Sequence, residues 1–261
     1  MELRSLVTEP GRVAVVTGAA RGIGAATAAA LAREGGTAVL LDRDVAGAEA
    51  RADDLRKSGL RALARSCDVS SDDSCKAALD AIREEFGRLD VLVNNAAVGV
   101  FDATLKSVSE DQWDEVLSVN LKSVFLVCRH AVPLMRLAGG GCIVNVASVH
   151  AMATTPGVLP YAAAKGGVVA LTRALALELA PDHIRVVAVL PGAVLTPMLT
   201  AHLDEAERRG EKLAFPDDPR EIGRIGGPAE VAEAITFLTS KRASFITGTS
   251  LAVDGGLLAR L

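Results

Sequence analysis

Three residues near the middle of the chain have types and a spacing that suit proton transfer. Tyr161 is the only tyrosine among 261 residues, and Lys165 follows it by four positions in a segment that reads as an apolar helix. Residues four apart lie on one face of a helix, so the phenol and the ammonium group should lie a few ångströms apart. Ser148 stands upstream, at the end of a predicted strand. Together they form a candidate site for acid–base chemistry.

Other interpretations of these residues are open on sequence grounds. A tyrosine at a helix start beside a lysine is ordinarily packing, with the lysine stem extending toward solvent. His150, two residues after Ser148, would suit a hydrolytic serine–histidine pair, but no G-x-S-x-G sequence surrounds the serine. We therefore expect His150 to line a substrate cavity.

A glycine-rich turn near the N-terminus predicts a dinucleotide site. The apolar run Val13-Ala14-Val15-Val16 is typical of a strand buried on both faces, and it leads into Gly18-Ala19-Ala20-Arg21-Gly22-Ile23-Gly24 and an alanine-rich helix. Glycines let the backbone approach a pyrophosphate, and a helix N-terminus supplies free N–H groups. Asp42, at the tip of the next strand, is placed to accept both hydroxyls of an adenosine ribose.

The alternation of segments predicts an α/β fold: a Rossmann-type doubly wound seven-stranded parallel sheet with helices on both faces, in a single domain over residues 1–261. The strands are expected at 13–16, 38–41, 60–64, 91–93, 142–147, 184–190 and 251–253, and the helices at 23–33, 45–58, 71–86, 110–137, 161–180 and 228–239. Residues 197–225 change abruptly to charged and turn-forming types. We expect them to form a substrate lid beside the strand tips.

Composition narrows the class of protein. Half of the residues are apolar and only 3% are aromatic, and the net charge of −4 favours no nucleic-acid partner. No apolar stretch is long enough to span a membrane, and residues 1–10 lack the core of a signal peptide. The four cysteines form no C-x-x-C pair, so reduced thiols in a cytoplasmic protein are expected. The histidines show no ligand spacing, and no metal site is expected.

The helices predicted at 110–137 and 161–180 are apolar around most of their circumference. A helix that covers one face of a sheet needs only one apolar stripe, so their outer faces should also be buried. The chain has no remaining domain to cover them. Self-association into a homodimer or homotetramer across two-fold axes is therefore expected.

With these landmarks the chain resembles the short-chain dehydrogenase/reductase family, in its single-domain branch. The resemblance covers about residues 10–256 and rests on seven ordered motifs: Thr17-Gly18-x-x-x-Gly22-x-Gly24, Asn94-Asn95-Ala96, Asn120, Ser148, Tyr161-x-x-x-Lys165, Pro191-Gly192 with Thr196, and Asp254-Gly255-Gly256. The family usually has glycine where Ala97 stands, and a methyl group there should crowd the adenosine ribose slightly.

The resemblance implies a catalytic tetrad of Asn120, Ser148, Tyr161 and Lys165. Tyr161 would exchange a proton with a secondary alcohol or ketone while hydride moves to or from a nicotinamide, and Ser148 would hydrogen-bond the substrate oxygen. Lys165 would hold the nicotinamide ribose, and Asn120 would position a water. Lowering the pKa of Tyr161 to near neutrality requires about 4 kcal/mol. A lysine charge about 5 Å away supplies on the order of 3 kcal/mol, and the positive nicotinamide of the oxidised cofactor is expected to provide the rest.

Substrate contacts are expected from Ser148, His150 and Tyr161. The expected cofactor contacts are Gly18, Arg21, Gly22, Ile23, Gly24, Asp42, Arg43, Asp68, Val69, Asn95, Ala96, Tyr161, Lys165, Pro191, Gly192, Val194 and Thr196. Among these, Asp68 would bind the adenine amine or, alternatively, help to cap the following helix. Asn94 and Asn95 could each be structural or functional, because amides at a strand end can also satisfy backbone groups.

The cofactor expected is NAD, with NADP as the alternative. A carboxylate at Asp42 would repel the 2′-phosphate of NADP, whereas Arg21 or Arg43 could pair with it. The expected function is an NAD-dependent dehydrogenase or carbonyl reductase, with a sugar- or polyol-like alcohol favoured. The alternatives are an NADP-dependent reductase of the 3-oxoacyl type and a non-catalytic nucleotide-binding sensor. An epimerase or dehydratase is disfavoured, because no C-terminal substrate domain is expected.

Overall fold

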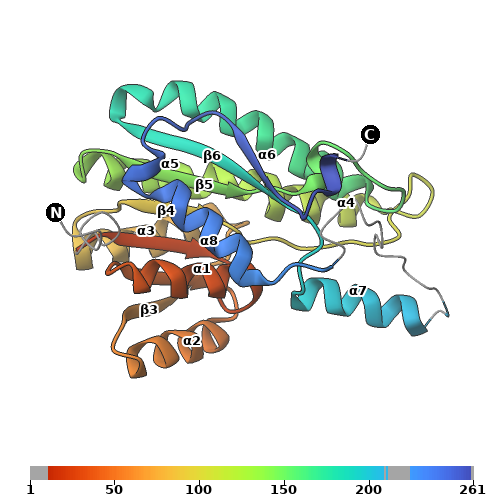
Figure 1. Ribbon diagram of the computed structural model, residues 1–261, viewed down its shortest axis with the longest axis horizontal. Coiled ribbons are helices and arrows are strands. Elements are labelled where there is room, and N and C mark those ends of the chain that lie inside the picture. Colours follow the sequence, from red (N-terminus) through yellow and green to blue (C-terminus); the bar gives the residue numbers. More distant parts are fainter. Residues whose placement is uncertain (1–10, 209, 211–223, 260–261) are drawn as a thin grey trace.

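A computed structural model describes residues 11–208, 210 and 224–259 and contains one parallel sheet (Figure 1). The strand order is β3-β2-β1-β4-β5-β6-β7, so the direction of winding reverses between β1 and β4. The strands are β1 (Val13–Thr17), β2 (Thr37–Asp42), β3 (Arg61–Ser66), β4 (Val91–Asn94), β5 (Gly141–Val146), β6 (Ile184–Pro191) and β7 (Ser250–Val253). The predicted doubly wound sheet is confirmed, and its crevice lies at the carboxyl ends of β1 and β4.

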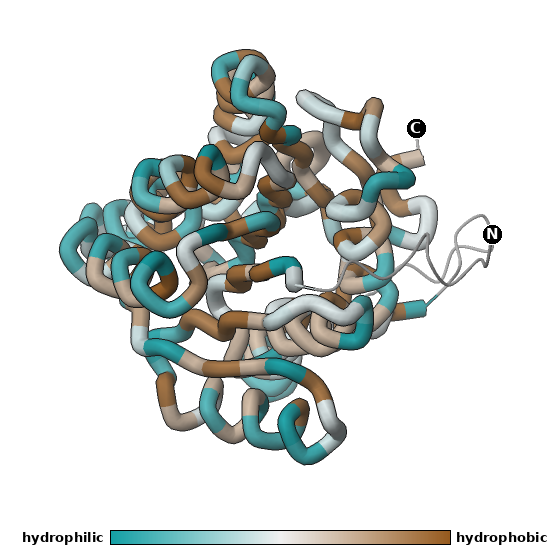
Figure 2. The backbone as a smooth tube through the Cα atoms, turned by 90° about the vertical axis from the view of Figure 1, so that its left-hand side faces the viewer, coloured by the Kyte–Doolittle hydropathy of each residue, from teal (hydrophilic) through white to brown (hydrophobic). Residues whose placement is uncertain are grey.

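Helices cover both faces of this sheet. One layer holds α1 (Gly22–Arg33), α2 (Val45–Lys57) and α8 (Pro228–Thr239); the other holds α3 (Asp72–Phe86), α4 (Glu110–Leu117), α5 (Ser123–Leu137) and α6 (Leu159–Glu178). The two layers produce two cores, and the hydrophobic stretches lie toward the middle of the molecule (Figure 2).

Strand β1 shows why its sequence is an uninterrupted apolar run. Val13 and Val15 belong to one core, and Ala14 and Val16 belong to the other. Successive side chains of a strand point to opposite faces, so a strand covered on both faces needs apolar residues at every position.

None of the helices in the described ranges is long and apolar enough to cross a membrane.

The helix predicted at 110–137 is not continuous. It consists of α4, a π-helical turn at Ser118–Lys122, and α5. The π-helical turn carries Asn120, whose side chain is buried. Single π turns inside helices frequently mark functional sites, because the extra residue changes the direction of a side chain.

The first part of the predicted lid is a helix, α7 (Pro197–Arg208), which the sequence analysis did not predict. Its charged residues lie on the exposed side, where Glu205 and Arg208 form an ion pair, and Ala206 is buried. Residues 209 and 211–223 of the predicted lid lie outside the described residues.

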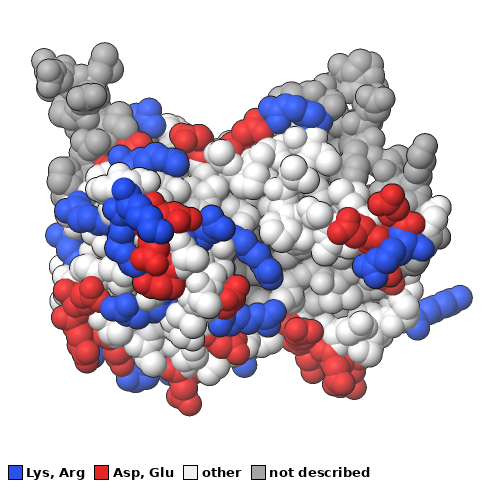
Figure 3. Space-filling model, turned by 90° about the horizontal axis from the view of Figure 1, so that it is seen from below, with Lys and Arg blue, Asp and Glu red and all other residues white. Residues whose placement is uncertain are grey.

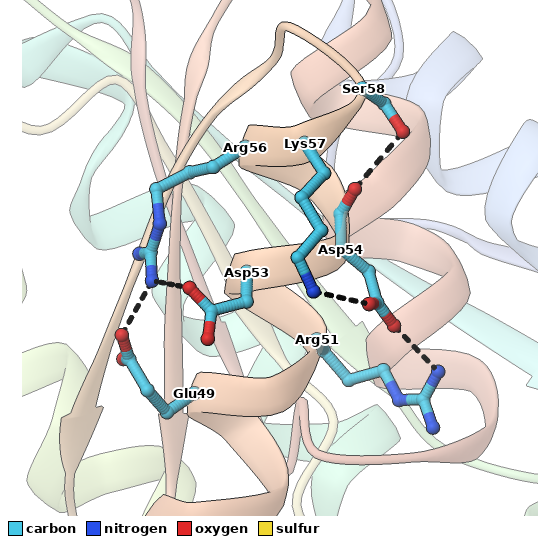
Figure 4. A network of polar contacts seen from close by, with 7 residues as sticks. All are labelled: Glu49, Arg51, Asp53, Asp54, Arg56, Lys57 and Ser58. Atoms are coloured by element: carbon cyan, nitrogen blue, oxygen red, sulfur yellow. Dashed lines mark hydrogen bonds and ion pairs between the residues drawn. The ribbon is translucent and has the colours of Figure 1, made fainter.

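Charged side chains gather over α2, at one end of the face shown in Figure 3. There Arg56 contacts Glu49 and Asp53, while Arg51 and Lys57 contact Asp54 (Figure 4). Exposed ion pairs of this kind contribute only about 0–1 kcal/mol each. We infer that these ion pairs lie on the solvent-exposed side of α2, which covers the sheet with its other side.

Candidate active site

Strand β5 and helix α6 bring Ser148, Tyr161 and Lys165 together, as predicted. Ser148 follows β5 and begins a short 3₁₀ turn, where its Oγ accepts a hydrogen bond from the His150 N–H at 3.2 Å. Lys165 Nζ lies 5.6 Å from the centre of the Tyr161 ring and donates to the Val146 carbonyl oxygen at 2.8 Å. The end of β5 therefore fixes the lysine and supplies the serine.

Burial controls the charge of this group. It lowers the pKa of the Lys165 ammonium to about 8, and it raises the pKa of Tyr161 although a hydrogen bond with Ser148 opposes the change. In the chain alone, desolvation therefore favours both neutral forms. In the chain alone the pKa of Tyr161 therefore rises, in contrast to the expected fall. The Lys165 ammonium, which is still largely protonated at pH 7 with a pKa of about 8, favours the phenolate, and the positive charge of a bound oxidised nicotinamide would add to this effect.

Asn120 connects the π-helical turn to the segment after β4. Its Oδ1 accepts a hydrogen bond from the Val98 N–H, and its Nδ2 donates to the Val98 carbonyl, both at 2.8 Å. The side chain is buried. Asn120 therefore supports the wall of the crevice, while its role in positioning a water stays a prediction.

The glycine turn after β1 is locked to the segment after β4. Gly18 has a φ of +64°, which favours glycine, and a Cβ there would lie 2.7 Å from the Ala96 Cα. Asn95 Nδ2 donates to the carbonyls of Thr17 (2.9 Å) and Gly18 (3.0 Å). Thr17 Oγ1 accepts from the N–H groups of Asn95 (3.0 Å) and Ala96 (3.1 Å). Thr17 was not predicted as a site residue, although its place at the start of the glycine motif was a signal.

A dinucleotide fits this turn. Helix α1 has no side-chain cap at its N-terminus and no acidic residue in its first turn, whereas Asp44, Ser71 and Ser109 cap the three helices that follow. Uncapped N–H groups suit a pyrophosphate. The Asp42 carboxylate is held at the tip of β2 by the N–H groups of Ala20 and Asp44, both at 2.9 Å.

Residues from the second half of the chain reach the same turn. A Cβ at Gly22 would lie 3.4 Å from Thr196 Cγ2, and one at Gly192 would lie 2.8 Å from the Asp254 Cα. Val194 is buried and Pro191 ends β6. The structure therefore places Thr196 beside the glycine turn and Gly192 beside Asp254, while binding of the cofactor by these residues stays a prediction.

The structure bears on the roles of Asp68, Asn94 and Asn95, which the sequence left open. Asp68 Oδ1 accepts hydrogen bonds from the backbone (2.9 Å) and hydroxyl (2.6 Å) of Ser70, which lower the pKa of Asp68, while Ser71 caps α3. The buried Asn94 Nδ2 donates to Asn145 Oδ1 at 2.9 Å, deep in the sheet. Asn94 is thus structural, whereas Asn95 supports the glycine turn.

Of the other predicted contacts in the first half of the chain, Val69 is buried, and Arg21 and Arg43 are exposed. Ala97, where the family usually has glycine, has no positive φ, so its methyl group causes no backbone strain.

His150 contacts Tyr161, and two residues that the sequence did not indicate form a ring stack that involves α7; a role of His150 in substrate binding stays a prediction. The His150 ring meets the Tyr161 ring edge-on at 6.0 Å, and its Nδ1 is 3.1 Å from Thr154 Oγ1. Burial lowers the pKa of His150. Phe101 and His202 stack with ring centroids 3.8 Å apart, so α7 packs on the segment that follows β4.

A hollow of about 460 Å³ lies at the amino ends of the strands and does not belong to this site. Its arginines are engaged in the fold. Arg12 donates to the Thr239 carbonyl at 2.8 Å, and Arg185 donates to the Leu238 carbonyl at 2.7 Å, at the end of α8. Cations there stabilise the negative end of the helix dipole.

A glycine turn that leads into an uncapped helix at a sheet crevice, together with a buried serine and lysine and a half-buried tyrosine, defines a nicotinamide-dependent oxidoreductase of alcohols and ketones. The family model described as "Enoyl-(Acyl carrier protein) reductase" matches residues 18–258. With the relatives below, this match shows that the chain belongs to the short-chain dehydrogenase/reductase family, as the resemblance implied.

Three similar proteins illustrate the family. The cis-4-hydroxycyclohexanecarboxylate dehydrogenase of Sinomonas cyclohexanicum is 46% identical, covering 95% of this chain and 97% of that protein. The cyclopentanol dehydrogenase of Comamonas sp. (strain NCIMB 9872) is 40% identical with the same coverage. The crystal structure of a 3-ketoacyl-(acyl-carrier-protein) reductase from Brucella melitensis, complexed with NADH, is 39% identical with a TM-score of 0.84, covering 95% of this chain and 98% of that one.

Proposed function

We propose that this protein catalyses the NAD-dependent interconversion of an alicyclic secondary alcohol and its ketone. The observation that carries the reaction is the group formed by half-buried Tyr161 with buried Ser148 and Lys165, in a fold whose glycine turn leads into an uncapped helix. Two relatives are named for ring alcohols, which favours this class over the sugar- or polyol-like alcohol expected from the sequence. The exposed side chains of Met152 (61%) and Leu195 (56%) give the region an apolar rim that suits a ring.

The residues of this chain then have distinct tasks. Ser148 Oγ and the Tyr161 hydroxyl hydrogen-bond the substrate oxygen, and Tyr161 takes the hydroxyl proton in oxidation and returns it in reduction. Lys165, fixed on the Val146 carbonyl, orients a ribose hydroxyl and adds positive charge when protonated. The bound nicotinamide supplies the hydride acceptor or donor. The Asp42 carboxylate and the free N–H groups of α1 bind the ribose and the pyrophosphate.

The test is NADH formation from cyclopentanol and cyclohexanol, with wild type compared to Tyr161→Phe. The substitution should lower kcat by a factor of about 10²–10⁴, the usual contribution of a general acid–base group, and leave NADH binding in place. A wild type that binds NADH but is inert toward these alcohols and their ketones would support the sensor alternative. Activity confined to 3-oxoacyl thioesters would support the 3-oxoacyl reductase instead.

We further propose that the protein self-associates through α5 and α6. Phe125 on α5 is 51% exposed and Leu177 on α6 is 82% exposed, so each helix leaves apolar surface uncovered in the single chain. Residues 197–225 as a substrate lid and the cytoplasmic location stay predictions.

A further inference from the structure

Helix α7 makes a specific contact with the segment that follows β4. Phe101 and His202 stack with ring centroids 3.8 Å apart and planes inclined by 17°. Gly99 lies beneath this contact, since a Cβ there would be 3.0 Å from Phe101 Cε2 and 3.2 Å from Met198 Sδ. Met198 and His202 are four residues apart on α7 and so share one face of the helix.

This contact stands at the wall of the active site. Val98, three residues before Phe101, exchanges two hydrogen bonds with Asn120. On the other side, the Ala103 N–H donates to the Gly157 carbonyl at 2.8 Å, and the Leu159 N–H donates to the Ala103 carbonyl at 3.1 Å, just before Tyr161.

Helix α7 also connects this contact to the glycine turn. Helix α7 begins directly after Thr196, which adjoins Gly22 of the glycine turn. The Phe101–His202 stack therefore joins α7, which starts beside the glycine turn, to the segment that is hydrogen-bonded to the start of α6.

One nitrogen in this wall has no partner. His202 Nδ1 is buried and makes no hydrogen bond to any residue that the structure describes. Buried polar atoms are nearly always hydrogen-bonded, so an unpaired one indicates a group that binds there. The Phe101 ring holds the imidazole from one face, which fixes the direction of its edge nitrogens.

We propose that His202 recognises a second polar group on the alcohol substrate, with Nδ1–H donating to an acceptor such as a ring carboxylate. The substrate class is then an alicyclic alcohol with an acceptor substituent, and Phe101 is the positioning residue for the imidazole. This proposal rests on the proposed alcohol dehydrogenase activity and adds the residue that selects among ring alcohols.

The test compares kcat/KM with NAD for cis-4-hydroxycyclohexanecarboxylate and for cyclohexanol. His202→Phe keeps a ring on Phe101 and removes the nitrogen. It should lower kcat/KM for the carboxylate about 10- to 100-fold, mainly through KM, and change cyclohexanol less than about 3-fold, because a hydrogen bond to a charged group is lost only with the first. His202→Asn, which places an amide near the position of Nδ1, should retain part of the preference.

Glu207→Gln, an exposed change on the same helix, is the matched control and should leave the ratio of the two values unchanged. Phe101→Leu should reduce the preference without removing it. An equal loss for both substrates in His202→Phe would mean that the stack is only structural, and an unchanged ratio would mean that Nδ1 has another partner. Either result overturns the proposal, whereas a wild type inactive on both alcohols overturns the proposed function instead.

Discussion

At the level of single residues, the catalytic group is a buried pair that prefers to be neutral. Burial raises the pKa of Tyr161 and lowers that of Lys165 to about 8. A dry environment opposes either charge alone but strengthens attraction between opposite charges. The phenolate that alcohol oxidation needs is favoured by protonated Lys165 and would be favoured further by the positive charge of the bound oxidised cofactor, which links activation of the base to cofactor binding.

This coupling predicts that cofactor binding lowers the pH at which Tyr161, the only tyrosine in the chain, ionises. Without cofactor, the absorbance of tyrosinate should develop only above pH 10, because burial disfavours the phenolate; with saturating NAD it should develop at lower pH. The raised pKa in the folded state also means that native stability falls as pH rises above about 10, where the unfolded tyrosine ionises first. Ultraviolet difference spectroscopy checks both states, and a cofactor-free titration below pH 10 would contradict the mechanism.

Asp42 should decide the choice of cofactor. Asp42→Asn keeps the shape of the side chain and a hydrogen-bond acceptor but removes the charge that repels a 2′-phosphate. We expect kcat/KM for NAD to fall about 10-fold or more, the effect of losing about one charged hydrogen bond, and kcat/KM for NADP to rise. Asp53→Asn, on the solvated side of α2, is the control. A wild type that already prefers NADP would remove the basis of this prediction.

At the level of elements, the sequence predicted those helices and strands whose burial is visible in the local pattern of apolar residues. Six of the seven strands contain an apolar run, whereas β3 has only a short apolar stretch between Arg61 and Arg65. Helices α1, α2, α3, α6 and α8 were predicted because their residue patterns are local. The π-helical turn could not be predicted, since Asn120 is held by its pairing with Val98 across the fold. Helix α7 was missed because its charges resemble those of a surface loop.

In the active site, too, the residues marked by local sequence were predicted and those placed by tertiary contacts were not. Ser148, Tyr161 and Lys165 were identified by motif and spacing, and the structure brings them together. Phe101 and His202 belong to no motif and meet only because α7 folds over the segment after β4. Such contacts depend on tertiary packing, which local sequence does not specify.

The π-helical turn should be costly to disturb. Asn120→Ala removes both hydrogen bonds to the Val98 backbone in a buried site, so we expect the free energy of unfolding to fall by about 1–3 kcal/mol and kcat to fall with it. Denaturant unfolding measures the first quantity and steady-state kinetics the second. Ser123→Ala, which removes only a local bond to the Val119 carbonyl, should cost less than about 1 kcal/mol. Equal losses for the two variants would argue against a special role for the turn.

At the level of the whole molecule, α6 has two different sides. Its inner side carries the buried Lys165 and packs on β6, and α5 lies in the same helical layer (Figure 1). Leu177 on α6 and Phe125 on α5 are exposed. Exposed apolar side chains on the covering helices of a sheet are typical of an interface between identical chains. If a second copy covers these side chains, assembly restrains the helix that carries Tyr161.

Changing these exposed side chains should therefore alter both assembly and activity. Leu177→Glu, alone or with Phe125→Glu, places unpaired carboxylates in the apolar interface and should shift the protein to monomer in sedimentation velocity. Ala50→Glu, the same kind of change on the solvated helix α2, should leave the assembly intact. Because α6 would lose its external support, kcat should fall in the monomer while the Ala50 variant keeps wild-type turnover. A Leu177 variant that stays assembled, or a monomer with full activity, would show that catalysis and assembly do not share this helix.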